Sequence, residues 1–324
     1  MFTEILVPLD GGRVAEQAIP LATALARRHG SRLHFVGVSR PVIFSNPGAY
    51  SPDIPLNASV ELDVIAAEEL ERYLLQWSRR VARADQVAVR SAVLKGAELV
   101  GDQLVEYAAR HNIELVIMHT HARGAVRRLW LGSVANALAQ KSGVPCLLLR
   151  GPLAATTEAV LPVRPHRIVV PLDGSIEAEL AVELAIACAD PEVTELELLT
   201  IVSPLPFPGS VLEGAALETR AAAAERYLAR VASRATEADI VTRSSVVIHA
   251  SPSVAIVGHV QQRGADLVAI AAHFRSGVNR VFLGSVMDRL LRKTHVPMLV
   301  WRSKELAGTE LLPLHAEPME LALH

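Results

Sequence analysis

The sequence of 324 residues is poor in several features that mark particular classes of protein. Aromatic residues make up only 4% of it, which argues against a surface on which single-stranded nucleic acid stacks. The formal net charge of −2 provides no basic face for nucleic acid or for an anionic membrane. No apolar run approaches the roughly 20 residues that a membrane-spanning helix needs. We therefore expect no nucleic-acid partner and no membrane partner.

Cysteine is also scarce. The two cysteines, Cys146 and Cys188, lie in an apolar run and in an alanine-rich stretch, without metal-ligand spacing and without a neighbouring histidine. We expect two buried thiols and no metal site. The sequence begins with an apolar strand pattern, and it shows neither the basic start nor the small-residue cleavage site of a secretory signal. These features predict a cytoplasmic protein.

Segments of the first half recur in the same order in the second half. The segment Ile5–Gly12 recurs at Ile168–Ser175, 163 residues later (168 − 5), and Leu131–Val134 recurs at Leu283–Val286, 152 residues later (283 − 131). The shift shrinks by 11 residues (163 − 152), so the first copy carries an insertion, which we place within residues 39–60. The chain is a tandem duplication.

Each copy alternates short apolar runs with amphipathic stretches. In the first copy this pattern predicts strands at 5–9, 33–38, 87–94, 115–118 and 144–149, and helices at 13–29, 59–84, 98–111 and 133–142. The long helix is expected to bury Leu62, Ile65, Leu70, Tyr73 and Trp77. Alternating strands and helices favour right-handed crossovers and a parallel sheet that is covered on both faces. The predicted fold is α/β, with two tandem doubly wound, open, parallel five-stranded sheets of the Rossmann-like kind.

The domain boundaries follow from the repeat and from composition. We expect a first domain at residues 1–150, a proline-containing linker at 151–165, a second domain at 166–302 and a tail at 303–324. Each domain is long enough to bury a core of its own.

Ligands of doubly wound sheets bind beyond the carboxyl ends of the strands. The candidate strand ends carry Asp10 and His119 in the first copy and Asp173 and Ala271 in the second. A Gly-Ser pair, Gly132-Ser133 or Gly284-Ser285, then opens a helix whose N-terminus could receive an anion. The ordinary structural explanation is also open, because serine and aspartate both cap helices without any ligand.

Three motifs recur in both copies, in register. They are Val7-Pro-Leu-Asp-Gly11, the loop His121-Ala-Arg123 that leads to Leu131-Gly-Ser-Val134, and the closing Val144-Pro-Cys-Leu147. Together they resemble the universal stress protein family over both halves of the chain. This resemblance implies a Rossmann-like fold and, as cofactor, an adenine nucleotide such as ATP.

In nucleotide-binding members of that family the loop reads Gly, two residues, Gly, nine residues, then Gly-Ser or Gly-Thr. The first copy has His119 and Ala122 at the two early positions, and the second has Ala271 and Phe274. Both copies keep the final Gly-Ser and lose both early glycines. Phe274 places an apolar ring where phosphate oxygens would lie, so the second cleft suits a less charged ligand better.

The resemblance implies a set of nucleotide-binding residues in each copy. In the first copy these are Asp10, Val38, His119, Ala122, Arg123, Gly132 and Ser133. In the second, where the match is weaker, they are Asp173, Ile201, Ala271, Gly284 and Ser285. In the family the acid lies beside adenine and ribose, and the backbone at the second strand's end contacts adenine. Loop arginines such as Arg123 could neutralise phosphate, although solvated arginines are the commoner case.

No catalytic carboxylate pair, nucleophile triad or metal cluster emerges from the sequence. We therefore favour a non-catalytic regulatory or interaction protein of the stress-response type. In it, Val144–Leu149 would pair with Val296–Trp301 and form a pseudo-dimer within one chain. The alternative is an adenine-nucleotide sensor acting through the first domain, with slow ATP hydrolysis or autophosphorylation at Ser133. A homodimer and unidentified protein partners also remain open.

Overall fold

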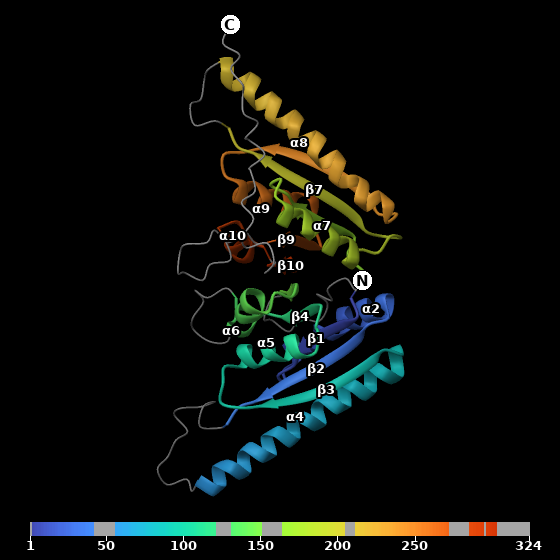
Figure 1. Ribbon diagram of the computed structural model, residues 1–324, viewed down its shortest axis with the longest axis vertical. Helices are drawn as coiled ribbons and strands as arrows, with labels where there is room; N and C mark the ends of the chain where they lie inside the picture. Colours follow the sequence, from blue (N-terminus) through green and yellow to red (C-terminus); the bar gives the residue numbers. More distant parts are fainter. Residues whose placement is uncertain are drawn as a thin grey trace. The chain divides into compact units, whose positions relative to one another are not determined.

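The computed structural model describes residues 2–41, 56–120, 131–150, 164–204, 211–271, 285–294 and 296–302. The chain forms two compact units (Figure 1). Unit 1 comprises residues 1–164 and 295–302, and unit 2 comprises residues 165–294 and 303–324. Most of the predicted linker, the whole tail and much of the predicted insertion lie outside the described residues.

Unit 1 is built on a sheet with the strand order β3-β2-β1-β4-β5-β10. Its strands are β1 (Glu4–Pro8), β2 (Arg32–Ser39), β3 (Ala88–Lys95), β4 (Leu115–His119), β5 (Cys146–Leu149) and β10 (Met298–Trp301). The strands β1 to β5 are mutually parallel, and β10 runs antiparallel to β5. All five strands predicted for the first copy are present.

The helices of unit 1 are α1 (Arg13–Glu16), α2 (Ile19–His29), α4 (Leu56–Asp85), α5 (Val100–Arg110), α6 (Ser133–Ala137) and the π-helix η2 (Leu138–Ser142). The predicted helix at 13–29 is divided into α1 and α2. Pro20 lies in the first turn of α2, where its missing N–H leaves no intrahelical bond unmade. The predicted helix at 133–142 changes from α to π geometry after Ala137.

Helices cover both faces of this sheet. Gly37 of β2 lies against Leu70 of α4, so closely that an added Cβ would come within 2.8 Å of the leucine side chain. His34, three residues earlier on the same strand, contacts Tyr107 of α5. Because successive side chains of a strand point to opposite faces, α4 and α5 lie on opposite faces. This is the doubly wound arrangement that the sequence predicted.

The buried face predicted for the long helix was partly wrong. Leu62 and Ile65 are 48% and 49% exposed, and the helix instead buries a stripe of Ala67, Leu74 and Val81. Ile65 lies about 200° around the helix from Ala67, since each residue turns the helix by about 100°. Tyr73 and Trp77 are half-buried at the edge of the stripe. Hydrophobicity alone therefore placed the stripe incorrectly in the first turns.

Unit 2 repeats the arrangement with the strand order β9-β6-β7-β8, all parallel. Its strands are β6 (Arg167–Pro171), β7 (Glu195–Val202), β8 (Val241–Ile248) and β9 (Leu267–Ala271). Its helices are α7 (Ile176–Cys188), α8 (Val211–Glu237), α9 (Pro252–Arg263) and α10 (Ser285–Lys293). Among the helices of the described ranges, none is both long enough and apolar enough to cross a membrane. The α/β fold class predicted from the sequence is confirmed.

The last strand of the second repeat, β10, belongs to unit 1. It pairs with β5 so that Val300 lies opposite Cys146 and Met298 opposite Leu148. Trp301 extends the contact, because its indole N–H donates to the carbonyl of Gly143 at 3.1 Å. Compact unit 2 therefore does not include β10, although this strand belongs to the second repeat.

Substituting Val300 by Asp tests how strongly unit 1 depends on β10. Val300 is 1% exposed, so the variant would bury a carboxylate without a partner and lower the free energy of unfolding by at least about 3 kcal/mol. The matched control is Val241→Asp, since Val241 also lies in a strand but is 61% exposed. Urea denaturation of both variants measures the difference. Equal unfolding midpoints would contradict the role assigned to β10.

Candidate functional site

The strand order of each unit defines one switch point. In unit 1 the chain winds from β1 through β2 to β3 on one side, and then crosses to β4 on the other side of β1. The crevice at such a reversal lies beyond the carboxyl ends of β1 and β4. Asp10 follows β1, and His119 ends β4. Unit 2 has the same switch point between β6 and β9.

Asp10 lies in a tight turn after β1. Its carboxylate oxygen Oδ1 accepts a hydrogen bond from the backbone N–H of Gly12 at 3.0 Å. Gly11 between them has a φ of +79°, a conformation that residues with a Cβ rarely adopt. The side chain of Asp10 is exposed, as a group that contacts a ligand would be.

Asp173 forms the equivalent turn in unit 2, with a difference in capping. Its Oδ1 accepts from the backbone N–H of Ser175 at 3.1 Å and from the Ser175 hydroxyl at 2.6 Å. The Ser175 Oγ in turn accepts from the N–H of Ala178 at 3.1 Å, so the serine caps α7. The aspartate therefore holds the capping serine and does not cap the helix itself.

The Gly-Ser pair of unit 1 also differs from the capping role considered for it. The N-cap of α6 is Gly132, and no side chain caps this helix. Ser133 is the first helical residue and is exposed. Its hydroxyl therefore makes no capping bond to α6. In unit 2, Ser285 is likewise the first residue of α10.

The remaining predicted site residues are described in part. His119 is buried, with 6% exposure, at the end of β4. Val38, Ile201 and Ala271 are half-buried at strand ends. The other loop positions singled out from the sequence lie outside the described residues: His121, Ala122, Arg123, Phe274 and Gly284.

Sequence reasoning missed a second acid near the end of β1. Glu16 of α1 accepts hydrogen bonds at Oε1 from the Tyr73 hydroxyl at 3.1 Å and from the Trp77 indole at 3.3 Å. Burial raises the pKa of Tyr73, and the charges of Glu16 and Asp10 raise it further, so these groups are close together. The repeated Glu-Arg-Tyr-Leu motif, which contains Tyr73, was the available signal for this contact.

The equivalent glutamate of unit 2, Glu179, has different hydrogen-bond donors. Glu179 accepts from the guanidinium groups of Arg230 at 3.4 Å and Arg234 at 2.6 Å. Burial and the charge of Glu179 raise the pKa of the nearby Tyr227. Neutral donors hold Glu16, whereas two cations offset the charge of Glu179. An anionic ligand would therefore meet less repulsion from this glutamate in unit 2 than in unit 1.

Metal ligation has no support in the described part of the chain. Within those ranges, no group of three or more His, Cys, Asp or Glu side chains is arranged to hold a metal ion.

Comparison with known proteins connects this geometry to a family. The sequence profile of the universal stress protein family matches residues 1–150 and 165–302, which together make up most of the chain. The chain belongs to the universal stress protein family and carries two of its domains in tandem. The family suggested by the sequence motifs is confirmed.

Relatives of similar length share this organisation. A universal stress protein of Mycolicibacterium smegmatis is 26% identical over 308 residues, which cover 93% of this chain and 97% of that protein. A universal stress protein of Mycobacterium tuberculosis is 28% identical over 314 residues, which cover 92% and 94%. Among solved structures, a universal stress protein of Archaeoglobus fulgidus superposes with a TM-score of 0.62 at 16% identity, over 92% of this chain and 98% of that one. These matches support the tandem fold.

The two serines at the helix starts offer a matched test of the capping geometry. We expect Ser175→Ala to lower the free energy of unfolding by about 1 kcal/mol, because α7 loses its cap. Ser133→Ala should change it by less than about 0.5 kcal/mol, because Ser133 makes no capping bond to α6. Thermal and urea denaturation measure both. A larger loss for Ser133→Ala would show that the cap assignment is wrong.

Proposed function

We propose that this protein is a cytoplasmic, non-catalytic regulatory or interaction protein of the universal stress type, whose two repeats pair within one chain. The observation that carries the proposal is the antiparallel pairing of β10 with β5. In this view the paired repeats form a scaffold for protein partners. Cys146 and Cys188 are both buried thiols, which supports a reducing compartment.

The edge of the parallel sheet explains why such pairing is needed. All four residues of β5 are buried, and they are entirely apolar. An exposed apolar edge strand would pair with another chain and aggregate. A single-repeat protein would need a second molecule to cover this edge, whereas a tandem chain carries the covering strand itself.

The residues at and after the strand ends support a non-catalytic role. The early glycines of the family's nucleotide loop are replaced in both copies. The carboxylates of Asp10 and Asp173 each accept a hydrogen bond from their own turn. Glu16 and Glu179 are each held by two donors. These contacts support structural roles for the acids near the switch points.

A cross-strand disulfide tests whether the pairing occurs within one chain. Val300 lies opposite Cys146, and residues directly opposite in an antiparallel pair have Cα atoms about 4.5–5.5 Å apart, within disulfide range. Val300→Cys, refolded under oxidising conditions, should therefore give a monomer with an internal disulfide. Oxidation during refolding is needed because burial raises the pKa of the Cys146 thiol to about 12, which leaves little thiolate in the folded protein.

Two variants control this experiment. Leu299→Cys lies opposite Leu147 and on the other face of the strand, so it should not reach Cys146. Val300→Cys combined with Cys146→Ser should form no disulfide between these strands. Non-reducing gel electrophoresis and intact mass distinguish the products. A covalent dimer as the main product would assign the pairing to two separate chains and reject the proposal.

A second candidate function is adenine-nucleotide sensing by unit 1. It is favoured by the exposed Asp10 turn at the switch point and by the helix that begins after Gly132. The resemblance to the family suggests that Val38, His119, Ala122, Arg123 and Ser133 complete this site.

Calorimetry with ATP, ADP and AMP tests this second function. If unit 1 binds a nucleotide, Asp10→Asn should weaken the affinity by about tenfold or more, whereas Asp173→Asn should leave it unchanged, because a lost hydrogen bond to a ligand is worth roughly 1–2 kcal/mol. Absence of binding by the unaltered protein at millimolar nucleotide would exclude the sensor. A loss with Asp173→Asn alone would move the site to unit 2.

A further inference from the structure

A polar cluster lies inside unit 1 near the start of β2, away from the switch point. Its centre is His34, which is only 1% exposed. The ring nitrogen Nδ1 of His34 lies 2.8 Å from the Tyr107 hydroxyl of α5, and Nε2 lies 2.6 Å from the Glu4 carboxylate of β1. His111, which follows α5, lies beside both rings, 5.6 Å from the His34 centroid and 4.2 Å from the Tyr107 centroid.

The hydrogen bonds of both histidines are complete when the rings are neutral. A carboxylate only accepts, so Nε2 of His34 carries the hydrogen and donates to Glu4, while Nδ1 accepts from the Tyr107 hydroxyl. A guanidinium only donates, so Nδ1 of His111 accepts from Arg90 of β3 at 3.4 Å. A proton added to Nδ1 of His111 would break the bond that this nitrogen accepts from Arg90, and a proton added to Nδ1 of His34 would require the Tyr107 hydroxyl to turn and accept.

The surroundings also oppose protonation. Burial lowers the pKa of His34, and His111 and Arg90 lower it further, whereas Glu4 acts in the opposite direction. Burial, Arg90 and Arg110 lower the pKa of His111, again against Glu4. Glu4 is itself shared, because Arg32 of β2 donates to its other oxygen at 3.1 Å. Burial and the neighbouring cations thus outweigh Glu4 and favour the neutral form of both rings.

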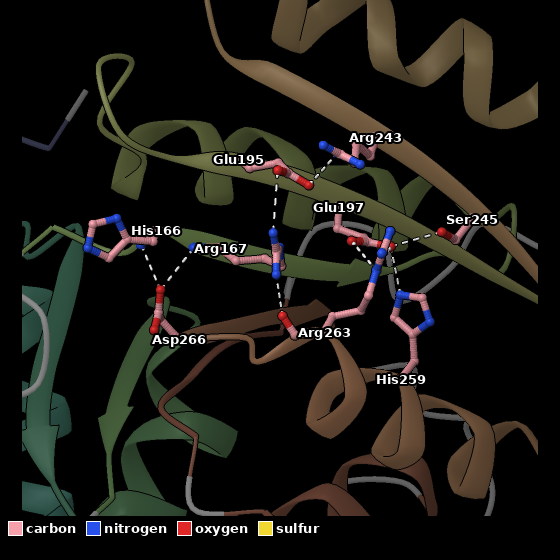
Figure 2. A network of polar contacts seen from close by, with 9 residues as sticks. All are labelled: His166, Arg167, Glu195, Glu197, Arg243, Ser245, His259, Arg263 and Asp266. Atoms are coloured by element: carbon pink, nitrogen blue, oxygen red, sulfur yellow. Dashed lines mark hydrogen bonds and ion pairs between the residues drawn. The ribbon is translucent and has the colours of Figure 1, made fainter.

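Unit 2 has a different chemistry at the equivalent positions. Glu197 occupies the place of His34 (34 + 163), and His259 and Arg263 occupy those of Tyr107 and His111 (107 + 152 and 111 + 152). Figure 2 shows the Glu197 carboxylate surrounded by Ser245, His259 and Arg263. Glu197 is fully buried, and its Oε1 accepts from Ser245 at 2.8 Å and lies 2.7 Å from Nε2 of His259. Arg263 donates to Oε2 at 3.0 Å.

The charge inversion extends to the neighbouring ion pair. Glu4 and Arg32 of unit 1 correspond to Arg167 and Glu195 of unit 2, which lie 3.4 Å apart (Figure 2). Burial by itself would raise the pKa of Glu197, but the hydrogen bonds from Arg263, Ser245 and His259 outweigh it and lower the pKa. Unit 2 therefore depends on a charged carboxylate where unit 1 depends on neutral imidazoles.

We propose that unit 1 is an acid-responsive module built on the His34–His111 pair, and that the Glu197 cluster keeps unit 2 folded through the same mild acidification. The response is a loosening of α5 from the sheet, because protonation of both rings, whose centroids lie 5.6 Å apart, would place two positive charges side by side on β2 and at the end of α5. Tyr107 of α5 and His111, the residue that follows it, connect this helix to the cluster.

The pH range follows from proton linkage. An unfolded histidine takes up a proton near pH 6.5, whereas the folded rings resist it, so unit 1 is fully stabilised above this pH and loses stability as the pH falls below it. Glu197 has a lowered folded pKa, so its contribution is present above its ordinary value of 4.5 and is lost below it. Between about pH 6.5 and 4.5, these two clusters predict a loss in unit 1 and none in unit 2.

Hydrogen exchange by mass spectrometry on the full chain, at pH 7.5, 6.5 and 5.5, tests the proposal. After correction for intrinsic exchange, protection of β1, β2 and α5 should fall by up to about tenfold per histidine for each pH unit below 6.5. Protection of β6, β7 and α9 should stay constant. Tryptophan fluorescence in urea gives a second reading, because Trp77, Trp130 and Trp301 all fall within the residue ranges of unit 1.

Substitution of each histidine identifies the responding groups. The glutamine of His34→Gln can donate to Glu4 and accept from Tyr107, so the amides of this variant should keep their protection from exchange at pH 7.5. The decrease in the logarithm of the protection between pH 7.5 and 5.5 should be about half of that in the unaltered protein. His111→Gln should lose the other half, and it keeps the test valid if the first variant folds poorly. The control is His166→Gln, whose side chain is exposed and whose backbone N–H makes the contact with Asp266. An equal response of both units, or an unaltered response in both histidine variants, would overturn the proposal.

Discussion

The pairing of β10 with β5 is the constraint on which the organisation of unit 1 depends. The four residues of β5 are buried and apolar, so the strand requires a neighbour on each side. β4 provides one and β10 the other. A strand from the end of the second repeat thereby becomes part of the core of the first unit. If the chain were cut between the repeats, β10 would be held in unit 1 only by its non-covalent contacts. Besides the pairing with β5, these contacts include the side-chain hydrogen bonds of Trp301 and Arg302.

Much of this fold could be predicted from the sequence, because its signals are local or repeated. Strand runs, turn glycines and the recurrence of whole motifs gave the α/β class, the duplication and the strand ends that carry Asp10 and Asp173. The exposure of Leu62 and Ile65 could not be predicted, because both residues are apolar and only the position of the sheet decides which side of α4 is buried. The capping role of Ser133 could not be predicted either. Whether Ser133 caps α6 depends on a shift of one residue in the start of this helix.

The polar contacts were the least predictable part of the molecule. Glu4, His34 and the neighbouring residues Tyr107 and His111 come from three separate segments of the sequence, and none of them belongs to a recognisable motif. The switch-point site is a contrasting case, because its residues lie in short motifs that survive in both copies. What the motifs could not indicate is how the neighbouring glutamates are neutralised. Tyr73 and Trp77 hold Glu16, whereas Arg230 and Arg234 hold Glu179, although both repeats keep the tyrosine.

The opposite charges of the two buried clusters also bear on how the repeats can change in evolution. Two similar halves of one gene can exchange segments by recombination. If recombination replaced β6 and β7 by β1 and β2 but kept α9, His34 would lie beside His259 and Arg263. If it replaced β1 and β2 by β6 and β7 but kept α5, Glu197 would lie beside Tyr107 and His111. A buried charge that loses its partner costs about 3–5 kcal/mol, a large share of the stability of a typical domain. The clusters therefore favour exchange of whole repeats over exchange of parts, and this would keep the sequences of the two halves distinct.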